Sequence, residues 1–274
     1  MRILAVLAVL LCSSRAFAGT LYALETTSDE SSSRLWSVDT ATGQSNVVVA
    51  LSSPVDDDIV LFNGILYGIG LVPGNLGFGT IDPTTGTVTL INAGTVGQGF
   101  TANPNLSVFY STGSTGRGLN NIQFDGSSTR IGGHNDFDTD IAYDSRNDVL
   151  YGYEFANSGI DIISTTSGEA AQLSTHIILP TGRQPGNLAY DSTDDTLYLI
   201  SVGAQTRDLY SIDRATGLPT LIAPTGIPSS TRLVGFADVQ NTPEPSTAGL
   251  MGFALAAVAV GRWCRARRTA NRSN

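Results

Sequence analysis

The chain contains no lysine: all 15 of its basic residues are arginine, against 24 acidic residues. Charged residues make up only 14% of the composition, below the usual quarter of a soluble protein. Residues 19–245 hold eight of the arginines and all 24 acidic residues, so this body has a net charge of −16. An acidic body repels nucleic acid and anionic lipid, and the sequence therefore predicts no nucleic-acid partner. It could attract cations, or its charge could serve solubility alone.

Cysteine is also absent from the body. The chain has only two, Cys12 and Cys264, and both lie close to its ends. This excludes a disulfide, a catalytic thiol and a thiolate metal site from residues 19–245. Two histidines, His134 and His176, are too few for a three-histidine metal centre. The chain also lacks a nucleophile elbow, a phosphate loop and a dinucleotide fingerprint, so no catalytic residue is assigned.

The amino terminus has the three parts of a secretion signal. A basic residue precedes a ten-residue apolar run that ends at Cys12, and a small-residue cleavage site follows at Ala16 and Ala18. The run is too short for a permanent bilayer anchor, so we predict a signal peptide over residues 1–18 that is cleaved after Ala18. Lipoprotein processing at Cys12 is the alternative, although the bulky Leu11 precedes it where a small residue is needed.

The carboxy terminus carries a short apolar segment between prolines and arginines. The stretch 246–261 is uncharged, and as a helix at about 1.5 Å per residue it covers roughly 24 Å, short of a ~30 Å hydrocarbon core. Such a segment suits transient passage through a membrane, with a plain anchor as the alternative. The positive-inside rule places the following arginines in the cytoplasm, namely Arg262, Arg265, Arg267 and Arg268.

This tail resembles the PEP-CTERM sorting domain of Gram-negative bacteria, which combines a Pro-Glu-Pro triplet, a short hydrophobic helix and an arginine cluster. Pro243, Glu244 and Pro245 form the triplet, and the other two parts follow it in order. The resemblance implies that the general secretion machinery and an exosortase handle the protein, which crosses the inner membrane and is cleaved near the triplet. It implies delivery to the cell surface or extracellular matrix, typically in bacteria that make exopolysaccharide. We therefore expect the body to associate with exopolysaccharide, a biofilm or another surface protein.

A hairpin repeats along the body. In each copy, alternating apolar residues form a strand with one buried face, then Asp or Ser starts a turn and Gly closes it. The equivalent turn positions are 43, 43, 39 and 49 residues apart, at Asp39, Asp82, Asp125, Ser164 and Asp213. A second pair of strands precedes each hairpin. Each period therefore holds four short strands, which is the content of a propeller blade.

The two ends of the repeat complement each other. Residues 20–24 match a second strand that lacks a first, and residues 233–238 match a first strand that lacks a second. If residues 233–238 form the inner strand of the first blade, the ring closes without exposed edges. We therefore predict an all-β propeller with five four-stranded blades. A six- or seven-bladed propeller and a pair of β-sandwiches are the alternatives.

The predicted organisation has four segments. A helical signal peptide over residues 1–18 precedes the propeller over residues 19–240. The sorting signal over residues 241–268 contains the hydrophobic helix, and residues 269–274 form a disordered tail. In its general form the body resembles quinoprotein or YVTN-type propellers, although it carries no motif that defines either family.

Acidic residues gather at one predicted mouth of the propeller channel. The loops that lead into the innermost strands surround this mouth, and they contain Asp56, Asp57, Asp58, Asp136, Asp138, Asp140 and Asn187. The alternating Asp136, Asp138 and Asp140 resemble part of a calcium loop, because Ca²⁺ takes several oxygen ligands from flexible segments. The Gly and Glu of an EF-hand are missing. A Ca²⁺ site is therefore an expectation, solvated turn residues are its alternative, and no other cofactor is predicted.

Aspartates and tyrosines also recur beside the turn between the first and second strands. Asp144, Asp191, Asp194 and Asp195 fall in this turn, where carboxylates bond nearby backbone N–H groups. Tyr143 and Tyr190 recur with the repeat, which predicts packing in the core rather than ligand stacking.

Two kinds of function fit these patterns. The first is a non-enzymatic surface or matrix protein that binds saccharide or protein through one face of the propeller. The second is a secreted propeller enzyme of the lactonase, lyase or glycoside hydrolase type. In that case paired carboxylates at the channel mouth would act as acid and base.

Overall fold

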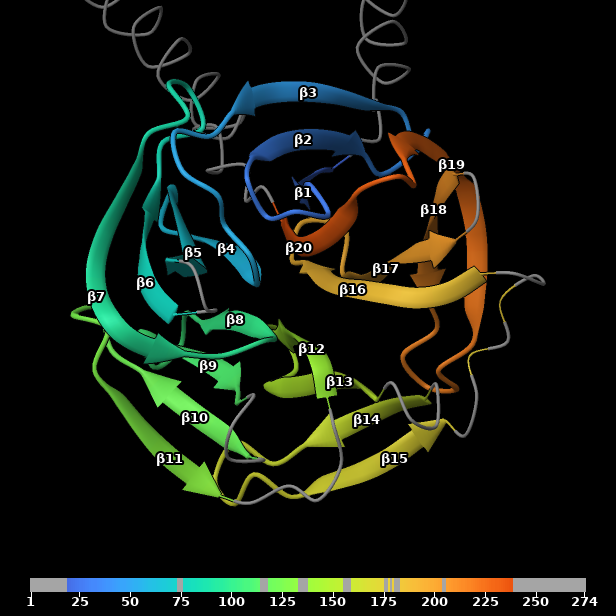
Figure 1. Ribbon diagram of the computed structural model, residues 1–274. Helices are drawn as coiled ribbons and strands as arrows, with labels where there is room; N and C mark the ends of the chain where they lie inside the picture. Colours follow the sequence, from blue (N-terminus) through green and yellow to red (C-terminus); the bar gives the residue numbers. More distant parts are fainter. Residues whose placement is uncertain are drawn as a thin grey trace, which may run out of the picture. The chain divides into compact units, whose positions relative to one another are not determined.

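The computed structural model describes residues 19–72, 76–113, 118–132, 138–154, 159–174, 177, 179, 183–203 and 206–238. These residues form five four-stranded antiparallel sheets, which surround a central channel as the blades of a propeller (Figure 1). The predicted all-β, five-bladed fold is thus confirmed. The described part of the chain contains no helix that could cross a bilayer, and the two predicted terminal helices lie outside it.

Each blade contributes one strand to the channel wall and three strands further out. From the inside outwards, blade 1 consists of β20 (Arg232–Asp238), β1 (Thr20–Thr26), β2 (Ser33–Asp39) and β3 (Ser45–Ala50). Blade 2 consists of β4 (Asp58–Phe62), β5 (Ile65–Val72), β6 (Leu76–Ile81) and β7 (Val88–Val96). Blade 3 consists of β8 (Phe100–Asn103), β9 (Val108–Thr112), β10 (Leu119–Ile122) and β11 (Ser128–Gly132).

The last two blades follow the same order. Blade 4 consists of β12 (Asp138–Asp144), β13 (Val149–Glu154), β14 (Gly159–Ile163) and β15 (Ala170–Ser174). Blade 5 consists of β16 (Arg183–Asp191), β17 (Thr196–Gly203), β18 (Thr206–Ile212) and β19 (Pro219–Pro228).

The ring closes by pairing strands from opposite ends of the body. The last strand, β20, lies antiparallel to the first strand, β1, so that Leu21 faces Asp238 and Ala23 faces Phe236. This is the closure that the incomplete first and last repeats predict. It leaves the innermost strand of every blade paired on its outer side, which protects the sheet edges around the channel.

The repeated turn has the chemistry expected from its sequence. In blade 1, the Asp39 carboxylate accepts hydrogen bonds from the N–H groups of Ala41 (3.0 Å) and Thr42 (2.8 Å). The N–H of Gly43 then donates to the Asp39 carbonyl at 2.8 Å, with Gly43 at a φ of 69°. This left-handed conformation strains other residues, which is why Gly occupies the position.

Among the described residues the core consists of five hydrophobic clusters, and each one lies between two neighbouring blades. The cluster between blades 2 and 3 is rich in aromatic rings, including Tyr67 stacked on Phe78 at 5.6 Å. Tyr143 and Tyr190 belong to the clusters on either side of blade 4, as the repeat predicts. Burial between blades therefore binds the ring together without disulfides.

The strand directions give the propeller two different faces. In each blade the first and third strands run in the same direction, so the turns that follow them lie on one face, which we call the turn face. The inner strands begin on the opposite face, which we call the channel mouth. Asp58 and Asp140 lie at or near the start of β4 and β12, at this channel mouth.

Candidate functional site

The channel mouth is closed by a carboxyl group from blade 2. Asp58 is 1% exposed, and its Oδ1 accepts hydrogen bonds from the N–H of Ile59 at 2.7 Å and of Phe236 at 3.3 Å. Its Oδ2 accepts a hydrogen bond from the N–H of Phe100 at 2.7 Å. Because Phe236 lies in β20 and Phe100 in β8, this one side chain joins three consecutive blades across the channel.

Blade 4 supplies a second carboxyl group in the equivalent position. Asp140 is also 1% exposed, and its oxygens accept hydrogen bonds from the N–H groups of Ile141 (2.7 Å) and Leu188 (2.6 Å). The Asn187 side chain of blade 5 also hydrogen-bonds to Asp140, and its Nδ2 donates to the Val234 carbonyl at 3.2 Å. Carboxyl and amide side chains thus link blade 4 to blade 5 and blade 5 to blade 1.

The two carboxyl groups hydrogen-bond to each other, which requires one of them to be protonated. Burial, followed by the charge of Asp140, raises the pKa of Asp58 well above its usual range. Burial also raises the pKa of Asp140, to about 7, while its hydrogen bond with Asp58 acts in the opposite direction. Burial and the mutual repulsion of two carboxylates therefore favour one proton shared by the pair, which carries at most one charge at neutral pH.

Glycines make room for this pair at two other equivalent positions. A Cβ on Gly235 would lie 2.9 Å from Asp58 Oδ1, and a Cβ on Gly99 would lie 2.8 Å from the Asp140 Cα. The five blades thus contribute Gly, Asp, Gly, Asp and Asn around the mouth. The glycines leave space for the Asp and Asn side chains to reach across the channel, so the five residues of the ring are complementary in size.

The channel beyond this ring is narrow. The cavity toward the turn face measures about 40 Å³ and is lined by residues of all five inner strands, among them Phe100, Ile141, Leu188 and Phe236. This volume holds only a few water molecules. Because the oxygens of Asp58 and Asp140 are bonded to backbone amides and buried, the pair as it stands joins blades and is closed to a substrate.

Two further aspartates lie just before Asp58 on the chain. Asp56 is 4% exposed and Asp57 is 8% exposed. Burial, followed by contact with Glu30, raises the pKa of Asp56 to about 6, and burial followed by the Asp56 charge raises that of Asp57 to about 7. Together with Asp58 they form a run of buried acids that favours protonation near neutral pH.

The expected Ca²⁺ ligands are only partly visible. Asp140 lies at the mouth, while Asp136 and the side chain of Asp138 are outside the described residues. Within the described part of the chain, three or more acidic, histidine or cysteine side chains nowhere form a group suited to a metal. The site therefore remains a prediction, and binding by Asp140 would have to displace the N–H groups of Ile141 or Leu188 from its oxygens.

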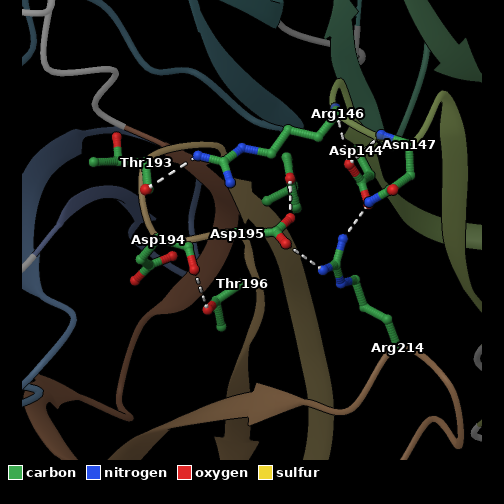
Figure 2. A network of polar contacts seen from close by, with 9 residues as sticks. Asp144, Arg146, Asn147, Thr193, Asp194, Asp195, Thr196 and Arg214 are labelled. Atoms are coloured by element: carbon green, nitrogen blue, oxygen red, sulfur yellow. Dashed lines mark hydrogen bonds and ion pairs between the residues drawn. The ribbon is translucent and has the colours of Figure 1, made fainter.

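The turn face carries a separate polar network between blades 4 and 5 (Figure 2). Arg214, from the turn after β18, forms ion pairs with Asp144 at the end of β12 and, at 2.9 Å, with Asp195. Tyr190 donates a hydrogen bond of 2.6 Å from its hydroxyl to Asp195. Asp144 also accepts hydrogen bonds of 3.0 Å from the N–H groups of its own turn, at Arg146 and Asn147.

The electrostatics of this network favour the ionised forms of its acids. Burial alone would raise the pKa of Asp144, but hydrogen bonds from Asn147 and the contact with Arg214 hold it below its usual range. The hydrogen bond from Tyr190, followed by that from Arg214, lowers the pKa of Asp195. The turn role predicted for Asp144 is confirmed, and the structure adds an ion pair between blades.

Beside this network the turn face is hollowed by an open cleft of about 640 Å³. The cleft is much larger than the channel cavity, and its lining combines polar and apolar surface. Hydroxyl, amide, carboxylate and guanidinium groups face it, from Asn147, Thr196, Ser211, Asp213, Arg214 and Thr220. It offers hydrogen-bond donors and acceptors to a ligand rich in hydroxyl groups.

Sequence reasoning placed Asp58, Asp140 and Asn187 at the channel mouth but missed their partners. The glycines at positions 99 and 235 are recognisable only as the residues before Phe100 and Phe236, in register with Asp58 before Ile59. The cleft and its Arg214 network were also missed. Arg214 follows the repeat-turn Asp213, at a position where the other copies of the turn carry small residues or proline. This difference is the sequence feature that could have indicated a special role for Arg214.

The sorting residues Pro243, Glu244 and Pro245 and the arginines from Arg262 to Arg268 lie outside the described residues, as do the cleavage residues Ala16 and Ala18. In fold, the body is similar to a chain in the crystal structure of a nidogen/laminin complex. The two share 12% identity and a TM-score of 0.50, over 81% of this chain and 85% of that chain.

Two other structures show weaker similarity. TolB from Acinetobacter baumannii has 14% identity and a TM-score of 0.49, over 77% of this chain and 54% of that chain. Hydrazine synthase from Kuenenia stuttgartiensis has 14% identity and a TM-score of 0.44, over 72% and 64%. No curated protein matches the sequence. A family model described as the PEP-CTERM protein-sorting motif matches residues 241–268. The chain is therefore an exported, five-bladed β-propeller protein that carries a PEP-CTERM sorting motif.

Proposed function

We propose that this protein works at the cell surface as a non-enzymatic binding propeller that associates with exopolysaccharide. The sorting motif at residues 241–268 supports the route: secretion, signal cleavage after Ala18, and release of the tail by an exosortase. The body would then act outside the cell, where it could meet extracellular polysaccharide. The turn-face cleft between blades 4 and 5 is the proposed binding site.

The observation that best supports this proposal is the difference in volume between the channel cavity and the turn-face cleft. The channel leaves about 40 Å³, whereas the turn-face cleft measures about 640 Å³, within the range of small-molecule sites. The polar side chains in its lining suit a saccharide, whose hydroxyl groups both donate and accept hydrogen bonds. The net charge of −16 over residues 19–245 favours a neutral or cationic polymer over an anionic one.

A bulky side chain placed in the cleft should weaken binding. Thr220 is exposed in β19 and lies opposite Ser211, both lining the cleft. Thr220→Trp should weaken binding to the exopolysaccharide of the producing strain at least tenfold, as measured by a glycan array and a pull-down. The matched control is Thr89→Trp, because Thr89 is exposed in β7 and lies opposite Thr80 at the same repeat position. Equal binding by both variants, or no ligand in either assay, would remove this proposal.

The alternative remains a secreted enzyme that uses the channel-mouth carboxyls. Burial raises the pKa of Asp140 to about 7, a value suited to acid–base chemistry near neutral pH. That reading requires the Asp58–Asp140 pair to open to a substrate. Turnover that survives alanine at Asp58, Asp138 and Asp140 would exclude these residues as its site.

A further inference from the structure

Asp191, at the end of β16, has a carboxylate oxygen without a partner. The residue is 0% exposed, and its Oδ1 accepts a hydrogen bond of 2.7 Å from the N–H of Thr193. Its Oδ2 is buried and forms no hydrogen bond within the described part of the chain. Burial raises the pKa of Asp191, and the nearby Asp194 charge adds to this effect. A buried carboxylate is strongly unfavourable unless a cation or hydrogen-bond donors compensate its charge.

The residue that faces this oxygen is Gly19, the first residue after the predicted cleavage site. Gly19 is buried, and its carbonyl accepts hydrogen bonds from the N–H and Oγ1 of Thr40, both at 3.0 Å. A Cβ built on Gly19 would lie only 2.0 Å from Asp191 Oδ2. Because the nitrogen and a Cβ share the same Cα, the Gly19 nitrogen lies within about 5 Å of that oxygen.

The corresponding place in the preceding blade is occupied by a cation. Asp144 is the repeat counterpart of Asp191, since each follows Ala-Tyr and ends the inner strand. Its Oδ2 pairs with Arg214, which also contacts Asp195 at 2.9 Å. This ion pair therefore links Arg214 of blade 5 to Asp144 of blade 4.

Blade 1 lacks this arginine. The residue after Asp39 is Thr40, at the position of Arg214 after Asp213, and Gly19 precedes Thr20 as Asp195 precedes Thr196. The seam between blades 5 and 1 thus has the carboxylate but no side-chain cation at the equivalent position. It has instead the backbone nitrogen of the residue that signal cleavage makes the first of the chain.

We propose that cleavage of the Ala18–Gly19 bond frees an α-ammonium group on Gly19, which forms a buried ion pair with Asp191 and fastens blade 1 to blade 5. Water adds across the peptide bond, so the signal peptide leaves with the carboxylate and Gly19 keeps the amine. An α-amino group has a pKa near 7.7–8.0 and is largely protonated at neutral pH. The inference rests on the proposed export route.

A second buried acid, Asp238, lies near the boundary between blades 5 and 1, where a cation would also stabilise its ionised form. Asp238, in β20, has a buried Oδ1 that lacks a hydrogen-bond partner within the described residues. Burial, followed by the Asp191 and Asp194 charges, raises its pKa to about 8. The Tyr198 hydroxyl, which also lies at this boundary, donates its hydrogen bond to Asp194. An α-ammonium at Gly19 would lower the pKa of both.

The absence of lysine makes the test specific, because the α-amine is the one primary amine of a chain that begins at Gly19. Such a chain, extending to Asn274, can be prepared in mild detergent by removing a tag with a protease that leaves Gly19 first. Its acylation by an amine-selective ester at pH 7.5 should be at least tenfold slower than that of the Asp191→Asn variant. Denaturant should abolish the difference.

Two controls keep the result interpretable. Asp194→Asn removes a neighbouring exposed carboxylate and should change the rate much less than Asp191→Asn. A chain that begins at Ala18 displaces the amine by one residue and should react rapidly while keeping every side chain of the propeller, whatever the folding of Asp191→Asn. Equal rates in the Gly19 chain and the Ala18 chain would overturn the ion pair. A mature protein that begins elsewhere in cells would instead contradict the export route.

Discussion

Replacing Asp58 with alanine is expected to lower the free energy of unfolding by about 3 kcal/mol or more. The substitution leaves the N–H groups of Phe100 and Phe236 without their acceptor in the closed channel mouth. Each buried, unsatisfied N–H costs about 1–3 kcal/mol. For a domain of this size the melting temperature should fall by roughly 6–12 °C.

Matched variants separate this effect from the loss of any aspartate. Asp82→Ala removes an exposed carboxylate from a repeat turn and should lower the melting temperature far less. Asp58→Asn keeps one acceptor oxygen and should be intermediate. Thermal unfolding followed by circular dichroism measures all three. If Asp58→Ala and Asp82→Ala have the same melting temperature, the side chains at the channel mouth do not hold the blades together.

The second large effect concerns pH: the protein should be more stable at pH 5 than at pH 8. Burial raises the pKa of Asp57 and of Asp140 to about 7, and that of Asp58 well above its usual range. In the unfolded chain these groups titrate near pH 3.9. The folded protein therefore binds protons that the unfolded chain releases, and stability is lost as the pH rises from about 4 through 7.

The magnitude follows from the number of such groups. Each contributes at most about 1.4 kcal/mol per pH unit while the folded form is protonated and the unfolded form is not. Asp57 and Asp140, each with a pKa of about 7, lose their protons between pH 5 and pH 8. This loss should lower the melting temperature by on the order of 10 °C. Asp57→Asn should flatten the profile, and Asp82→Asn should leave it unchanged. A higher melting temperature at pH 8 would contradict the assignment.

Most of the fold could be predicted because it depends on local chemistry that repeats. The Asp-to-Gly turns fix where strands end, and the incomplete repeats at residues 20–24 and 233–238 specify the closing pair. These features need only neighbouring residues on the chain. The number of blades follows from counting them.

The site could be predicted only in part, because its chemistry depends on distances across the ring. Asp58 and Asp140 are 82 positions apart, and only the placement of five blades brings their carboxyls into contact. The sequence suggested solvated acids or Ca²⁺ ligands there, whereas the structure shows Asp58 and Asp140 buried against backbone amides. The need for Gly99 and Gly235 becomes visible only once those side chains cross the channel.

Mass spectrometry of the protein recovered from the cell surface tests the central claim most directly. The account predicts a chain that begins at Gly19, yields peptides up to about Gln240, and yields none beyond Arg262. A full-length chain in the cytosol, with residues 1–18 and the arginine cluster both intact, would contradict export and sorting together.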